Sequence, residues 1–251
     1  MKALIHYLLQ NYLRSYLFIP PVTIFIIWTV VSYTYTPNPI LSSYAIASAV
    51  LYFITAWISL TLLNVEDNVQ QHITIVHSKG IVKIFCGKVF SVLCFSFVLS
   101  LFAIIYPVLA GAFARMPNTF EFFISFISLM LVSLLSLSIV ILFHSFFQVR
   151  TISSWLLLSL LLAISLAKSG IENILPNDLS FITWPLPPVL VILTLLEDDT
   201  VTLDIHFVLN SIYVFSYALI LLFISFVIIR NQNGWKFLKN KSKTTRKLDR
   251  R

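Results

Sequence analysis

The chain has 251 residues, of which 59% are hydrophobic and 11% are charged, and its formal net charge is +7. An ordinary soluble domain carries roughly 25% charged residues, so this composition excludes a water-soluble globular protein. The apolar residues form long uninterrupted blocks, which predicts an all-α polytopic membrane protein.

The first segment, residues 1–15, mixes apolar and polar side chains at helical spacing. Its apolar members are Leu4, Ile5, Leu8, Leu9 and Leu13, and its polar members are Lys2, His6, Gln10 and Arg14. This pattern predicts an amphipathic helix that lies along the inner leaflet of the membrane.

A spanning helix needs about 20 mostly apolar residues to cross roughly 30 Å of hydrocarbon. We predict six such helices, at residues 16–35, 44–63, 89–113, 122–147, 152–167 and 207–229. They form the transmembrane domain, residues 16–229, and the fifth helix is the shortest.

A further apolar segment, residues 180–196, contains Pro185, Pro187 and Pro188. Proline removes backbone donors and breaks helical continuity, so this segment is not counted as a span. We expect it to be re-entrant from the outer leaflet, and an outer loop that lies along the membrane surface is the alternative.

The distribution of positive charge tests this count, because Lys and Arg favour cytoplasmic loops. With six spans and a cytoplasmic N-terminus, 15 of the 17 Lys and Arg residues are cytoplasmic, and only Arg115 and Lys168 lie outside. Nine of those 15 lie in a basic tail, residues 230–251. The sequence therefore predicts a multi-pass plasma-membrane protein with both termini in the cytoplasm.

The loop between the second and third predicted spans, residues 64–88, reads NVEDNVQQHITIVHSKGIVKIFCGK. Asn64 can cap a helix, Glu66 and Asp67 suit the positive end of its dipole, and Lys79 suits its C-terminal end. The loop is therefore expected to contain a short cytosolic helix.

No catalytic machinery is recognisable in the chain. The nearest approach to a phosphate-binding P-loop runs from Gly80 to Lys88, but it has one residue too many and ends in Val89. No metal-ligand motif is present, and His144 is the only ionisable His, Asp, Glu, Lys or Arg within the six predicted spans. The chain is expected not to be an enzyme and to hold no cofactor or metal itself.

The loop resembles the coupling region of permeases of the second-type ATP-binding-cassette (ABC) exporters. In that family an acidic residue follows the second span, a short coupling helix comes next and a Gly-Lys pair opens the third span. Here these features look like Glu66, the helix through His77, and Gly87-Lys88. The amphipathic N-terminal helix, the short fifth span and the proline-rich outer segment are similar to the same pattern.

The resemblance implies a permease subunit of a bacterial ATP-driven exporter. A second permease chain, identical or related, would complete a dimer, and two copies of a cytosolic ABC ATPase subunit would bind ATP and Mg. The ATPase-coupling interface would comprise Glu66, Asp67, Gln70, Gln71, His72 and Lys79. The loop departs from many members at residues 70–72, where they carry a small Gly-Thr or Gly-Leu step.

The resemblance also suggests an amphipathic peptide as the cargo, such as a phenol-soluble modulin, another toxin, an antimicrobial peptide or an immunity substrate. Membrane lipids are expected partners and nucleic acid is not. An exporter of drugs, lipids or cell-wall precursors is the alternative within transport. A non-transporting immunity or scaffold protein and an intramembrane enzyme are alternatives from other classes.

Four aromatic residues within the spans are candidates for lining the transport pathway. They are Tyr52, Trp57, Tyr106 and Trp155. Aromatic residues in spanning helices more commonly serve packing or anchor the helix at the interface, so this assignment competes with a purely structural one.

Overall fold

The computed structural model describes residues 2–66, 70, 74, 80–147, 152–174, 186–197 and 205–248. These residues are mainly helical and form no strand, apart from one isolated bridge between Asn38 and Phe113. In chain order the helices are α1 (Lys2–Arg14), α2 (Ile19–Ser32), α3 (Ile40–Asn64), α5 (Ile81–Leu109), α6 (Thr119–Phe147), α7 (Ile152–Leu166), α8 (Lys168–Ile174), α9 (Val189–Glu197) and α10 (Ile205–Leu248).

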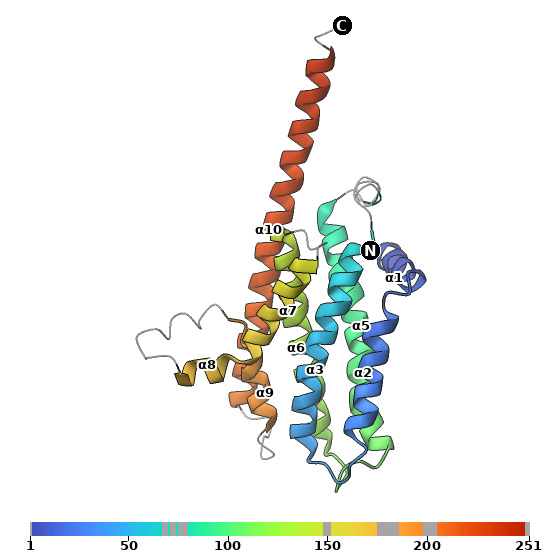
Figure 1. The fold of residues 1–251 in the computed structure, drawn as a ribbon, viewed down its shortest axis with the longest axis vertical. Helices are drawn as coiled ribbons and strands as arrows, with labels where there is room; N and C mark the ends of the chain where they lie inside the picture. Colours follow the sequence, from blue (N-terminus) through green and yellow to red (C-terminus); the bar gives the residue numbers. More distant parts are fainter. Residues whose placement is uncertain are drawn as a thin grey trace.

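Helices α3 and α6 form the centre of the bundle. In each of them 67% of the most apolar 18-residue window is buried inside the protein, compared with 39% for α5 and 22% for α10. Helix α10 packs mainly on α6, and α5 packs on both central helices. Figure 1 shows these helices side by side, with α2 beyond α3 and α5.

Within the described part of the chain, four helices are long and apolar enough to cross a membrane: Ile40–Asn64, Ile81–Leu109, Thr119–Phe147 and Ile205–Asn231. Helices α1 and α2 add a fifth crossing if they are taken together, but the chain bends by 79° between them. The protein is therefore an all-helical, membrane-embedded chain with four or five helices of spanning character.

The six predicted spans are supported only in this coarser form. Helix α2 has 14 residues rather than the 20 predicted for its span. It begins late because Tyr16 has a positive φ of 57° and the helix restarts at Ile19, followed by Pro20 and Pro21. Helix α7 has 15 residues, about 22 Å at 1.5 Å per residue. A sixth span through α7 stays a prediction.

The described part of the proline-rich outer segment is a short helix inside the bundle. Helix α9 packs against α3, α6, α7 and α10, and Val189, Ile192 and Leu196 are fully buried. Residues 180–185 lie outside the described residues. The position of α9 is compatible with the expected re-entrant segment, and its depth in the membrane stays a prediction.

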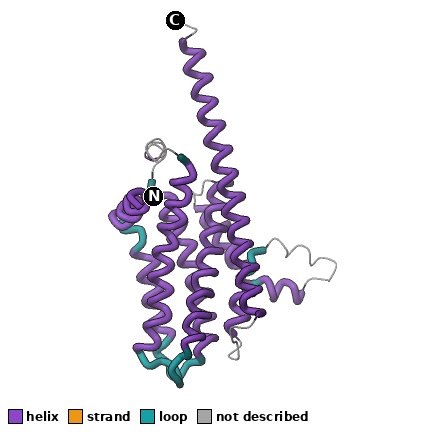
Figure 2. The backbone as a smooth tube through the Cα atoms, turned by 180° about the vertical axis from the view of Figure 1, so that it is seen from behind, coloured by secondary structure: helices purple, strands orange, loops and turns teal. Residues whose placement is uncertain are grey.

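One end of the bundle gathers α1, the end of α3, the start of α5 and the end of α6, and we refer to it as the α1 end. The loops at residues 33–39 and 110–118 lie at the opposite end (Figures 1 and 2). Helix α10 continues past the α1 end to Leu248, so the described part of the predicted basic tail extends a helix of spanning character.

Candidate functional site

The α1 end contains a buried ion pair that joins α5 to the residues just after α3. Lys88 Nζ lies 3.2 Å from Glu66 Oε2, and the two side chains are only 8% and 2% exposed. This Oε2 atom accepts no hydrogen bond from the described residues. The contact is therefore an ion pair by proximity, without the alignment of a hydrogen bond.

Two residues of the loop between α3 and α5 are placed beside this pair. Both Gln70 and Thr74 are helical, and the Thr74 hydroxyl donates to the Gln70 carbonyl at 2.9 Å. Thr74 Oγ1 also lies 3.4 Å from Glu66 Oε1. These two residues fit the predicted coupling helix, most of which lies outside the described residues.

The loop is also joined to α1, because Gln70 Nε2 donates to the Tyr7 hydroxyl at 2.9 Å. Tyr7 is 38% exposed, so this bond lies at the surface of the α1 end. The loop therefore contacts α1 through Gln70 and α5 through Glu66, so a displacement of the loop would act on both helices.

Helix α1 is seated on α5 at a glycine. A Cβ atom on Gly87 would lie 3.1 Å from Leu8 Cδ1 and 3.3 Å from Leu4 Cδ2. Glycine at this position lets the two helices approach more closely than any other residue would allow. The Gly87-Lys88 pair thus serves two contacts, one with α1 and one with Glu66.

The C-terminal half of α1 is anchored by Tyr12, which is fully buried. Its hydroxyl lies 2.7 Å from Thr61 Oγ1, and its ring meets that of Phe95 edge-on with centroids 5.2 Å apart. Either hydroxyl can donate in this contact, and the Thr61 hydroxyl also lies 2.9 Å from the Trp57 carbonyl of its own helix. Nearby, His144 Nε2 and Asn64 Oδ1 join the ends of α6 and α3 at 3.2 Å.

Among the predicted coupling residues, Glu66 and Gln70 fall within the described part of the chain. Glu66 is 3% exposed and faces Lys88, which assigns its side chain to an internal contact rather than to an accessible surface. Asp67, Gln71, His72 and Lys79 lie outside the described residues. Their role in an ATPase interface stays a prediction.

The four pathway candidates lie on three different helices. Tyr52 is fully buried in α3, and its hydroxyl lies 2.9 Å from Ser165 Oγ of α7. Trp57, Tyr106 and Trp155 are half-buried, and Trp155 packs against the core. Tyr52 therefore has a clear packing role, and a role for any of the four in transport stays a prediction.

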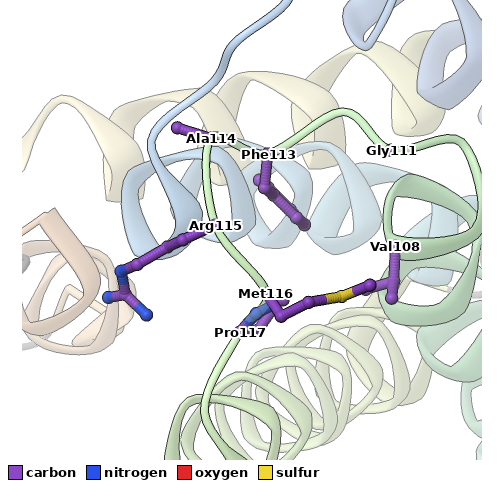
Figure 3. Close-up of a pocket in the computed structure, with 7 residues that line it drawn as sticks. All are labelled: Val108, Gly111, Phe113, Ala114, Arg115, Met116 and Pro117. Carbon is purple, nitrogen blue, oxygen red and sulfur yellow. The ribbon is translucent and has the colours of Figure 1, made fainter.

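The opposite end of the bundle has a depression of about 240 Å³ in the loop after α5. Its lining residues are Val108, Gly111, Phe113, Ala114, Arg115, Met116 and Pro117. In Figure 3 the Met116 side chain extends toward Val108, whereas the Arg115 guanidinium points away from both. Arg115 makes a two-pronged contact with Glu121, so its charge is already compensated.

Sequence reasoning missed Tyr7, Tyr12 and the partnership of Lys88 with Glu66. Only the Gly-Lys pair was a signal, and it indicated the start of a span rather than an ion pair.

Among the described residues, no three His, Cys, Asp or Glu side chains are grouped so that they could hold a metal ion. Comparisons with protein-family models, curated proteins and solved structures found no match for this chain.

Proposed function

We propose that this chain is the membrane permease subunit of an ATP-driven exporter, with ATP hydrolysed by a separate cytosolic ABC ATPase. The partner would dock on the loop between α3 and α5. A second permease chain would complete the transporter in the plasma membrane, and the cargo would be an amphipathic peptide.

One observation carries this proposal. The loop is tied to α5 by the buried Glu66–Lys88 pair and to α1 by the Gln70–Tyr7 hydrogen bond. A ligand can shift a conformational equilibrium only if it interacts differently with the two states. A partner that pulls on this loop in one nucleotide state has a direct mechanical connection to two helices of the bundle.

The scarcity of ionisable side chains in the predicted spans supports an energy source outside this chain. Coupled carriers for protons or sodium use ionisable residues inside the membrane, whereas the six predicted spans contain only His144. In the structure His144 contacts Asn64 at the α1 end, which favours a structural role for it. The choice of a peptide cargo rests on the family resemblance alone.

The decisive experiment is mild-detergent purification of the tagged chain from its native membrane, followed by mass spectrometry and an ATPase assay. We expect a P-loop ATPase to co-purify in roughly equal amount. Gln70→Ala and Tyr7→Phe remove the same hydrogen bond, so both should reduce peptide-stimulated ATPase activity and leave co-purification intact.

The matched control is Tyr44→Phe, which removes a buried tyrosine hydroxyl that donates to the Ile104 carbonyl at 3.3 Å and should leave coupling unchanged, because Tyr44 is not among the pathway candidates. A chain that elutes alone and without ATPase activity would contradict the exporter proposal and favour a scaffold or immunity protein. If drugs or lipids, but not peptides, stimulate the ATPase activity, the proposed cargo is wrong and the proposed exporter architecture still holds.

A further inference from the structure

Helix α1 presents three distinct faces, and its packing on the bundle fixes their directions. Leu8 and Tyr12 are buried, and Leu4 packs with Leu8 over Gly87 of α5. These three residues define the bundle face. The directions of the other side chains of α1 follow from the helical spacing of about 100° per residue.

One of the remaining faces is apolar. Leu9 and Leu13 follow the bundle-facing Leu8 and Tyr12 by one position each, so they lie about 100° around the helix. Leu13 is 45% exposed. The chain continues from this end of α1 into α2, whose exposed residues include Ile24, Ile27 and Val31. The exposed apolar residues of α1 are thus followed directly along the chain by the exposed apolar residues of α2.

The exposed side of α1 is polar, and a cation lies at each of its two edges. Lys2 precedes Leu9 by seven positions and shares the apolar flank, whereas Arg14 follows Tyr7 by seven positions and shares its side. Lys2, His6, Gln10 and Arg14 are all exposed, and the chain contains no Asp or Glu before Glu66. Lys2 and Arg14 are 12 positions apart in the sequence, about 18 Å along the helix. Each cation can therefore meet a different headgroup.

The orientation of α1 suits the plane of a membrane surface. The 79° bend turns α1 almost perpendicular to α2, as Figure 1 shows at the end of the bundle. A helix with an apolar flank, a polar face and cations lies in the interface with its apolar residues in the acyl boundary. The occupant that fits this combination is a bilayer with anionic headgroups.

We propose that α1 is a binding surface for anionic phospholipid headgroups, and that their binding steadies the loop at Gln70 through the Tyr7 hydroxyl. Tyr7 lies on the polar side of α1, and Gln70 contacts it there. Arg14 lies on the same side of α1 as Tyr7, so a headgroup bound at Arg14 meets the side of the helix that contacts the loop. The regulatory half of this inference rests on the proposed function, whereas headgroup binding does not.

Headgroup binding is tested with the full chain in nanodiscs without any ATPase. Cys86 and Cys94 are free thiols, so both are replaced by Ser before Leu13→Cys is introduced and labelled with a fluorophore. Spin-labelled phosphatidylglycerol and spin-labelled phosphatidylcholine are then compared as quenchers at equal mole fraction. We expect the anionic lipid to be enriched near the label by roughly fivefold per cation.

Replacing both cations with Lys2→Gln and Arg14→Gln should bring the two quenchers to equality. The charge-matched control is Lys83→Gln with Arg230→Gln, which removes two exposed cations from α5 and α10. This control should keep the preference, and about 1 M salt should remove it. Equal quenching in the parent protein, or equal loss in the control, would overturn the inference.

The link to the loop has its own readout. With Cys86 and Cys94 again replaced by Ser, a spin label on Thr74→Cys reports the mobility of the loop by electron paramagnetic resonance while the Gln70–Tyr7 hydrogen bond stays intact. We expect at least twofold slower motion of the label in phosphatidylglycerol discs than in phosphatidylcholine discs, and no such difference when Tyr7→Phe removes the hydroxyl. Equal mobility in both kinds of disc, together with a lipid preference at residue 13, would overturn the regulatory half alone. Because no ATPase is present, neither outcome depends on the exporter proposal.

Discussion

Replacing Lys88 with methionine should destabilise the protein strongly, because it strands a carboxylate in the interior. The Glu66 side chain is 2% exposed, and Lys88 Nζ is the cation 3.2 Å from its Oε2 atom. Methionine keeps the length and apolar stem of lysine and removes only the charge. The variant therefore isolates the electrostatic part of the contact.

The expected magnitude follows from the distance. At 3.2 Å and an effective dielectric constant of about 20, the gross attraction of two unit charges is about 5 kcal/mol. Removing one partner of a buried pair costs about 3 to 5 kcal/mol. We expect a value of about 3 kcal/mol for Lys88→Met, because Glu66 Oε2 lacks an aligned hydrogen bond among the described residues.

The assay is a double-mutant cycle of unfolding free energies in mixed micelles, followed by circular dichroism. Its members are the parent, Glu66→Gln, Lys88→Met and the double variant. The double variant should recover most of the loss, because no uncompensated charge remains. If Lys88→Met and the double variant are equally destabilised, the loss comes from packing and the electrostatic reasoning is refuted.

Three other changes test separate features of the fold. Gly87→Leu should displace Leu8 and expose α1 to proteolysis several-fold faster, whereas Gly87→Ala should shift stability by no more than about 1 kcal/mol; identical cleavage rates for the two variants would argue against the close seat of α1. Tyr16→Gly should raise the free energy of unfolding by up to about 1 kcal/mol, because φ is 57° there; a measured loss of stability would mean that the tyrosine side chain outweighs the strain. Tyr52→Phe should cost about 0.6 to 1 kcal/mol through its bond to Ser165 and leave transport unchanged; a loss of transport at normal stability would restore Tyr52 to the pathway.

Hydropathy was sufficient to locate the central helices. The predicted spans 44–63 and 122–147 lie inside α3 and α6, because uninterrupted apolar blocks can be stabilised only as helices in lipid. The third span was predicted to begin at residue 89, whereas helix α5 already begins at Ile81. Its first two turns contain Lys83 and Lys88, and a hydropathy pattern assigns charged residues of this kind to a loop.

The candidate site was only partly predictable, because its contacts join residues that are far apart in sequence. Glu66 looked like a surface residue in the first turn of a cytosolic helix, and only the position of Lys88 on α5 explains its burial. The bond between Tyr7 and Gln70 spans 63 positions. Nothing in the local pattern of either residue indicates the other, since this contact depends on how α1 folds back over α5.

The seat of α1 also sets the order in which the protein can be assembled during synthesis. Helix α1 is made first, but its contacts include Thr61, Gly87 and Phe95. At about 5 to 20 residues per second, the ribosome needs several seconds to reach Phe95. During that interval α1 lacks its contacts with Gly87 and Phe95, so the membrane interface must hold that side of the helix until α5 has been inserted.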